Sequence, residues 1–385
     1  MLNLTLPAGW HNVTRQPHRT ESTDPFDFAG ITAPACRIKR MSKVARDNMD
    51  ARRPQPSPVT IMIGLEAVIV AVTEGVPRIL SVGHTDHALS PPEHGVRTRP
   101  EAPDALPFGP LDPSADCTLD QALRGWVSEQ TGLSLGYVEQ LYTFGDPYRD
   151  PLQREGGPRV ISVAYLALTR ECVPAREQNA SWRDCYTYLP WEDWREGRPQ
   201  ILGHVIEPAL QQWLTGINEP SRQRRQRERV DICFGFSGSA WDPERALERY
   251  QILYEAALVP EAWPQDTPAE RLPTSPSGRP MALDHRRILA TALGRLRGKL
   301  KYRPVVFELL PDTFTLSQLQ GVVEALSGVR LHKQNFRRLV EKGGLVEESG
   351  GTTFSTGGRP AKLFRFRREV LRERPAPGVR LPGAS

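Results

Sequence analysis

The chain has 385 residues, which is enough for two globular domains with additional tails. Hydrophobic residues make up 39% of the sequence, and no apolar run reaches the roughly 18 residues that a membrane-spanning helix needs. The amino-terminal residues also lack the apolar core of a secretory signal. The five cysteines are scattered and form no CxxC pair, which disfavours a disulfide framework or a zinc site and predicts a cytoplasmic protein.

Charge is distributed unevenly along the chain. Residues 284–385 carry 20 Lys and Arg against 9 Asp and Glu, and residues 1–58 carry 9 against 5. Because the net charge of the whole chain is only +5, residues 59–283 must be acidic. An acidic middle joined to a basic C-terminal module predicts two parts with different partners, with nucleic acid as the candidate for the basic part.

Residues 1–58 are polar, contain prolines and show no sustained periodicity, so we expect a disordered basic leader. The basic run at 37–53 has two interpretations. It would be an arm on DNA, or it is a solvated leader that precedes a later start codon at Met41 or Met49.

The pattern of residues 60–169 predicts an α/β sandwich. β-Branched residues dominate 60–83, which predicts two strands around a turn at Glu74-Gly75. After a polar loop at 84–104, a helix is expected over 118–131, with Thr118 as its N-cap and Gly132 as its C-cap. Residues 159–169 then predict another strand.

Residues 186–283 predict helices and connecting segments. One helix is expected at 204–214 and another at 243–258. The basic run 221–230 is interpreted as either a helix or a linker. The density of prolines at 260–283 predicts a loop or linker.

The C-terminal module has the pattern of a winged helix-turn-helix. A helical apolar stripe covers 284–301, and Thr315 is a good N-cap for a second helix over 316–326. After a short turn, Phe336, Leu339 and Val340 form the apolar edge of a third helix, which ends at Gly343-Gly344. Residues 345–367 then predict a hairpin, which would be the wing.

The third of these helices, at 331–342, is the candidate reader of DNA. Arg and Gln side chains can bond guanine and adenine edges in the major groove, and Lys and Arg also neutralise phosphate. The alternative is a solvated basic face on a module that binds only protein. The predicted DNA-binding residues are Lys333, Gln334, Arg337 and Arg338 on the helix, with Arg359 and Lys362 on the wing.

Residues 117–133, CTLDQALRGWVSEQTGL, resemble the box of Nudix hydrolases, and Leu106-Pro107-Phe108-Gly109 resembles the loop that precedes it. Alignment on Gly132-Leu133 places Trp126, Glu129 and Gln130 where the consensus has three glutamates. Three carboxylates on one helical face would hold Mg²⁺ beside a pyrophosphate.

This chain offers one carboxylate, one amide and one indole at those positions, and Gly125 takes the place of the consensus arginine, next to Arg124. We therefore predict no catalytic residue and no metal site, and a ligand sensor rather than a hydrolase. Glu129 is kept as a candidate effector-binding residue, with a plain surface carboxylate as the alternative.

Further segments resemble one family over about residues 60–380. They are FGDPYRDP at 144–151, RVISVAYLAL at 159–168, HKQNFRRLVEKGGLVEESG at 332–350 and GRPAKLFRF at 358–366. Together they resemble Nudix-related transcriptional regulators of NAD metabolism, most closely the alphaproteobacterial NAD-regulator branch. The resemblance implies a Nudix-like sensor joined to a winged helix, acting as a dimeric repressor of NAD-biosynthesis or salvage genes on a palindromic operator in double-stranded DNA.

The resemblance also implies an effector. An adenine nucleotide or NAD-related compound is expected, with ADP-ribose as one precedent, and no cofactor is expected. Carried onto this chain, Arg149, Asp150 and Arg159 are the effector-proximal residues, because such side chains pair with phosphates and ribose hydroxyls. A local ion pair between Arg149 and Asp150 that braces a loop is the alternative.

The resulting organisation is a leader, a sensor, a linker, a winged helix and a tail. The expected bounds are 1–58 for the leader, 59–218 for the sensor, 219–283 for the helical and proline-rich linker, 284–370 for the winged helix-turn-helix and 371–385 for a disordered tail. The main rival function is a Nudix pyrophosphohydrolase of the ADP-ribose type with an accessory winged helix.

Overall fold

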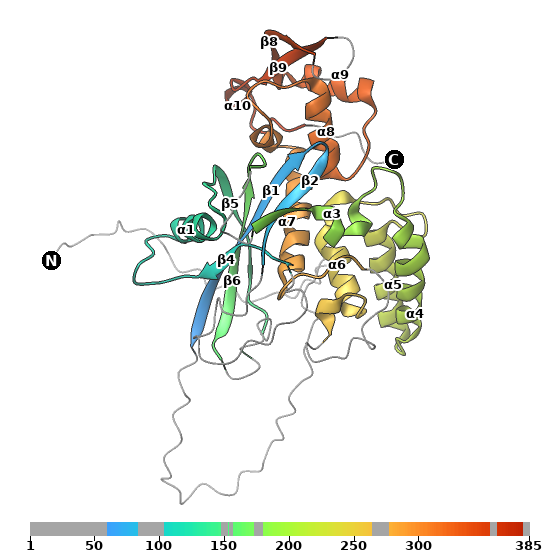
Figure 1. The fold of residues 1–385 in the computed structure, drawn as a ribbon. Helices are drawn as coiled ribbons and strands as arrows, with labels where there is room; N and C mark the ends of the chain where they lie inside the picture. Colours follow the sequence, from blue (N-terminus) through green and yellow to red (C-terminus); the bar gives the residue numbers. More distant parts are fainter. Residues whose placement is uncertain are drawn as a thin grey trace, which may run out of the picture. The chain divides into compact units, whose positions relative to one another are not determined.

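A mixed seven-stranded sheet organises the first half of the fold (Figure 1). The computed structural model of the chain describes residues 60–83, 104–147, 153, 157–172, 180–263, 277–354 and 360–379. The strands are β1 (Ile61–Thr73), β2 (Val76–Gly83), β3 (Asp104–Ala105), β4 (Phe108–Pro110), β5 (Tyr137–Phe144), β6 (Arg159–Leu168) and β7 (Ala180–Asp184). Their order is β3-β2-β1-β6-β5, with β4 paired to β1 and β7 paired to β2. Among the pairs of these described strands, only β1–β6 is parallel.

The predicted hairpin at 60–83 is confirmed. Thr73 pairs with Val76, and the two residues between them have positive φ angles, 52° for Glu74 and 75° for Gly75. Left-handed backbone at both central positions matches the twist of a two-residue hairpin, and glycine adopts it without steric cost.

Helices cover both faces of the sheet, which confirms the predicted α/β sandwich. Helix α1 (Leu119–Thr131) buries Leu123 and Val127 in a cluster that contains Leu65 and Ile69 of β1. Alternate residues of β1 point to the opposite face, because the side-chain period of a strand is two. There Val68 and other β1 residues join the larger core, which is shared with the helices that follow.

Four strands of the sheet were not predicted: the two short strands β3 and β4, and the longer strands β5 and β7. Strand β5 buries only Leu141 and Phe144, and its pairing with β6 shifts register between Gln140 and Tyr142. Strand β7 has no buried residue. Edge strands of this kind lack the alternating apolar pattern by which a strand is recognised in a sequence.

The helices between the sheet and the C-terminal module form part of the same core. They are α3 (Cys185–Tyr188), α4 (Glu207–Thr215), α5 (Pro220–Phe234), α6 (Ala246–Glu255) and α7 (His285–Leu300). Short helical turns lie at Pro190–Glu192 (η1), Leu202–Ile206, Pro243–Arg245, Pro260–Ala262 and Val305–Leu309. No helix among the described residues is both long and apolar enough to cross a membrane.

The basic run at 221–230 is helical, as one of its two interpretations required. Val230 and Phe234 of α5 and Leu253 of α6 are fully buried in the large core cluster. This part of the expected linker is therefore packed structure. A linker was one interpretation of the sequence, because arginines in this run far outnumber the few apolar residues that are buried.

The C-terminal module has the predicted helix-turn-helix and wing. Its elements are α8 (Leu316–Ser327), α9 (Lys333–Gly343), β8 (Val346–Thr353), β9 (Ala361–Phe366) and α10 (Val370–Glu373). Thr315 caps α8 in a capping box with Gln318, and Gly344 ends α9 with a φ of 56°. Strands β8 and β9 pair as the hairpin.

The predicted tail differs from the structure at its start. Val379 is buried in the large core cluster, and a side-chain carbon on Gly378 would overlap the backbone of Lys301 and Tyr302. Residues 377–379 are therefore packed beside the residues that follow α7, whereas residues 374–376 are exposed. The leader at 1–58 lies outside the described residues.

Candidate nucleic-acid interface and effector site

Helix α9 separates its apolar and polar side chains as a recognition helix requires. Phe336 and Val340 are buried in the core of the module. The four predicted reading residues, Lys333, Gln334, Arg337 and Arg338, are all exposed. Arg338 donates a hydrogen bond to the Asn335 side chain of the same helix at 2.8 Å. The outward placement expected from the sequence is confirmed.

The wing carries basic side chains that are already paired with glutamates. Lys362 lies 2.7 Å from a Glu348 oxygen, and Arg365 lies 2.6 Å from a Glu347 oxygen. Exposed ion pairs contribute only about 0–1 kcal/mol, so a phosphate group could take over these cations at little cost. Arg359, the other predicted wing residue, lies outside the described residues.

Helix α1 has the caps expected of the Nudix-like helix. The Thr118 hydroxyl accepts from Gln121 N, and Gly132 adopts the left-handed conformation with a φ of 72°. Arg124 donates to Asp120 at 2.8 Å and also to the carbonyl oxygen of Leu135. These contacts fix the helix and the turn that follows it.

Two of the three residues that align with the Nudix glutamates hold strand β4. The indole of Trp126 donates to Pro110 O at 2.9 Å, and a side-chain carbon on Gly109 would overlap that ring. The Gln130 amide accepts from Phe108 N at 3.1 Å and donates to Phe108 O at 2.6 Å. The pair closes β4 against the helical face.

That face does not fit a divalent cation. Mg²⁺ requires oxygen ligands, usually carboxylates, with several retained waters. An indole provides no ligand, and both polar atoms of the Gln130 amide are engaged by backbone. Glu129 is exposed on α1, and no cluster of three His, Cys, Asp or Glu within the described parts of the chain could hold a metal.

The segment expected to contact an effector is described only in part. Arg149 and Asp150 lie outside the described residues, so their ion pair and their approach to Arg159 stay predictions. Arg159 begins β6 and donates to Gly145 O at 2.6 Å, which ties the start of β6 to the end of β5.

One contact beside this segment was not predicted. Arg287 on α7 lies 2.5 Å from an Asp146 oxygen and 5.4 Å from the centre of the Phe144 ring. Phe144 and Asp146 belong to the FGDP motif, so the sequence marked one side of the contact. The arginine comes from a helix 141 residues later, and no local pattern identifies it.

Residues 306–366 match the family described as the NrtR DNA-binding winged helix domain. Helices α8 and α9 and both wing strands lie within this range. The C-terminal module is therefore similar to the NrtR-type winged helix domain. This match agrees with the regulator family that the sequence resembles.

A curated relative supports the assignment of the NrtR-type domain. The chain is 40% identical over 86 residues to the ADPR responsive transcriptional repressor NtrR of Acinetobacter baylyi. The matched segment covers 22% of this chain and 34% of the relative. The chain therefore matches only about a third of that repressor's length.

Two solved structures of NrtR from Shewanella oneidensis are also similar. The NrtR complex with a 27mer DNA is 19% identical, with a TM-score of 0.47, over 80% of this chain and 94% of that chain. The NUDIX domain of the same NrtR in complex with ADP-ribose is 20% identical, with a TM-score of 0.27, over 32% of this chain and 73% of that one. Both TM-scores are too low to establish a shared fold by themselves.

Proposed function

We propose that this chain is an effector-responsive transcriptional repressor that binds double-stranded DNA through α9. The observation that supports this most directly is the NrtR-type winged helix domain, whose recognition helix presents Lys333, Gln334, Arg337 and Arg338 to solvent. We also propose a cytoplasmic location, because a repressor must reach the DNA that it binds. Selection of duplexes from a random library, followed by a salt-dependent gel shift, tests DNA binding directly.

The proposed effector is an adenine nucleotide or an NAD-related compound, and the regulated genes are those of NAD biosynthesis or salvage. Support comes from the FGDPYRDP segment and from the name of the Acinetobacter relative, which describes an ADPR responsive repressor. A thermal-shift comparison of ATP, NAD, ADP-ribose and nicotinamide mononucleotide would select the ligand. Binding of none of the four would remove the effector part of the proposal.

We propose a homodimer as the DNA-binding form. A two-fold symmetric dimer presents two recognition helices, so the operator should be palindromic, with half-sites about one helical turn of DNA apart or a multiple of it. Light scattering of the free protein and footprinting of the selected duplex test both statements.

The rival function, Nudix hydrolysis, is disfavoured by the contacts of the α1 face that aligns with the Nudix glutamates. Trp126 and Gln130 bond to β4, and cleavage of a pyrophosphate requires a metal that neutralises charge and positions a water molecule. We expect no turnover of ADP-ribose with Mg²⁺ or Mn²⁺ in an assay of released AMP. A rate within the roughly 1–10³ s⁻¹ typical of enzymes would instead establish the hydrolase.

Replacing the effector-proximal arginines should weaken effector binding. Charge-assisted hydrogen bonds to a phosphate contribute about 1.5–3 kcal/mol each, so Arg149→Ala and Arg159→Ala should each cost about tenfold or more in affinity. Operator affinity without effector should stay close to that of the wild type. Titration calorimetry with the selected nucleotide measures the first effect, and wild-type affinity in both variants would show that the effector binds elsewhere.

Arg170→Ala is the control for that measurement. Arg170 is exposed directly after β6, so it has the same charge near the other end of the strand. Its replacement should leave the effector affinity unchanged. An equal loss in the control would indicate a general charge effect and would contradict a specific role for Arg149 and Arg159.

A further inference from the structure

Residues 185–196, which we call the strap, connect the sheet to the helix-turn-helix. The strap contains α3 and η1 and directly follows β7. The Tyr186 hydroxyl donates to Ala325 O, near the end of α8, at 2.7 Å. The Trp194 backbone N–H donates to Gly328 O at 2.7 Å, and Trp194 forms a parallel bridge with Val329. The strap thus pairs with the turn that leads into α9.

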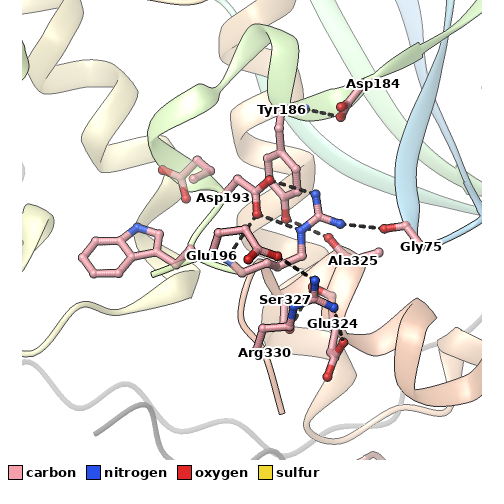
Figure 2. Close-up of polar contacts among 12 residues, drawn as sticks. Gly75, Asp184, Tyr186, Asp193, Glu196, Glu324, Ala325, Ser327 and Arg330 are labelled. Atoms are coloured by element: carbon pink, nitrogen blue, oxygen red, sulfur yellow. Dashed lines mark hydrogen bonds and ion pairs between the residues drawn. The ribbon is translucent and has the colours of Figure 1, made fainter. Parts of the chain in front are cut away.

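An ion-pair chain extends the contact to the last residues of that turn (Figure 2). Arg330 lies 2.6 Å from a Glu196 oxygen of the strap and 3.4 Å from a Glu324 oxygen of α8. Glu324 is buried and accepts from Leu331 N at 2.9 Å. The Glu324 carboxylate therefore binds the backbone just before α9, and it also pairs with Arg330, which contacts Glu196 of the strap.

The other side of the strap is fixed to the sheet. Figure 2 shows the Asp184 carboxylate accepting from Tyr186 N, at 2.9 Å, and Gly75 beside the strap. The Arg195 guanidinium donates to Gly75 O at 2.6 Å and to both oxygens of Asp193. Gly75 is the turn residue between β1 and β2. The strap therefore has one set of bonds to the sheet and a second set to the helix-turn-helix.

The fit at the turn leaves no room for a side chain. Gly328 has a φ of 74°, which only glycine adopts readily. A side-chain carbon there would lie 2.5 Å from Glu192 O, 2.6 Å from Arg297 Nη2 and 3.0 Å from the Tyr186 hydroxyl. Because these atoms surround Gly328 so closely, the distance between the strap and the turn is fixed.

We infer that the strap sets the position of the recognition helix, and that Tyr186 is a positioning residue for operator binding. Tyr186 touches no predicted DNA-reading residue and acts through Ala325 and the turn after it. The inference rests on the proposed DNA-binding function. The sheet domain then influences operator affinity through the strap. A conformational change in the sheet can therefore move α9 although the sheet itself does not contact DNA.

Tyr186→Phe and Tyr188→Phe form a matched pair for the test. Both side chains are buried in α3, and each substitution removes one hydroxyl. The Tyr188 hydroxyl donates to Asp104 of β3 at 2.6 Å, so it has no contact with the winged helix through this atom. Tyr186→Phe removes the bond to Ala325 O and a longer bond, 3.4 Å, that the hydroxyl accepts from Arg297 Nη2. It should weaken affinity for an operator selected by the wild-type protein by about three- to tenfold, the net effect expected chiefly from the bond to Ala325. Tyr188→Phe should bind that operator like the wild type.

Amide hydrogen exchange gives a second measurement. It can detect a local change at the turn and α9, which a general loss of stability would not confine to those residues. Exchange at residues 328–343 should accelerate in Tyr186→Phe and not in Tyr188→Phe, whereas the rest of the core should exchange similarly in both. Gly328→Ala disrupts the same contact from the winged-helix side and should show the same pattern. Equal operator affinity and equal exchange in the two tyrosine variants would overturn the inference, whereas a wild-type protein that selects no duplex would instead overturn the proposed function.

Discussion

Replacing Glu192 with glutamine should destabilise the fold by about 3–5 kcal/mol, because it leaves two buried arginines without their counter-charge. Glu192 and Arg249 are fully buried, and Arg297 is 1% exposed. Arg249 bonds both oxygens of Glu192 at 2.6 and 2.8 Å, and Arg297 Nη1 lies 2.5 Å from one of them. Urea denaturation of the variant and the wild type measures the difference in the free energy of unfolding.

Glu207→Gln is the matched control. Glu207 also pairs with an arginine, Arg198, at 2.7 Å, but both side chains are more than a third exposed. An exposed pair contributes about 0–1 kcal/mol, so this change should barely alter the free energy of unfolding. Similar stability of the two variants would mean that solvent screens the Glu192 triad as well.

The same triad predicts how stability depends on pH. Burial alone would raise the pKa of Glu192, but Arg249 and Arg297 outweigh it and hold that pKa below its usual value. A carboxyl with a lowered pKa in the folded state contributes stability above its unfolded pKa of about 4.3. That contribution is lost as the pH falls through the folded-state pKa. The acid limb of the stability curve should therefore be shallower in Glu192→Gln than in the wild type.

Replacing Lys333, Arg337 and Arg338 together with alanine should abolish specific binding to the operator. A bidentate contact of an arginine to a base contributes about 1–3 kcal/mol, so the combined loss should reach about 100-fold or more. All three side chains are exposed, so thermal stability should change little. A gel-shift titration at several salt concentrations should also show a smaller salt slope, because fewer phosphates are neutralised.

Single variants separate reading of bases from binding of phosphate. Arg338→Ala should relax the preference at one base position, whereas Lys333→Ala should weaken all sequences alike and lower the salt slope by about one unit. Phe336→Ala is the control for a purely structural helix. Phe336 is 1% exposed, so its removal should cost about 3–5 kcal/mol of stability without a change in base preference. Unaltered operator binding by the triple variant would show that α9 is not the reader.

The sequence by itself determined the elements whose signals are local. The β1–β2 turn places positive φ on two adjacent residues, and Gly75 marks the turn in the sequence because glycine adopts that conformation without steric cost. Thr118 and Thr315 lie beside the helices that they cap, so a single window of sequence contains the whole interaction. The apolar edge of α9 similarly identified its exposed side, because the helical period assigns every residue to a face.

The sequence also showed that only one of the three positions aligned with the Nudix glutamates carries a carboxylate, but only the tertiary structure decided what the other two residues contact. Trp126 and Gln130 bond to the backbone of β4, and an indole or amide carries no signal of which backbone it will meet. The polar edge strand β5 was hidden for a related reason. Its residues pair with β6 through backbone groups that every residue possesses, so the side chains gave little indication of a strand.

The contacts that join the sheet to the helix-turn-helix were decided entirely by the tertiary structure. Tyr186 and Ala325 are 139 residues apart, and Arg297 and Glu192 are 105 residues apart. Periodicity and capping relate residues within a few turns of one element, whereas these pairs form only after separate elements have packed. A buried arginine and a surface arginine also look identical in a sequence, because the partner that allows burial is supplied by the fold.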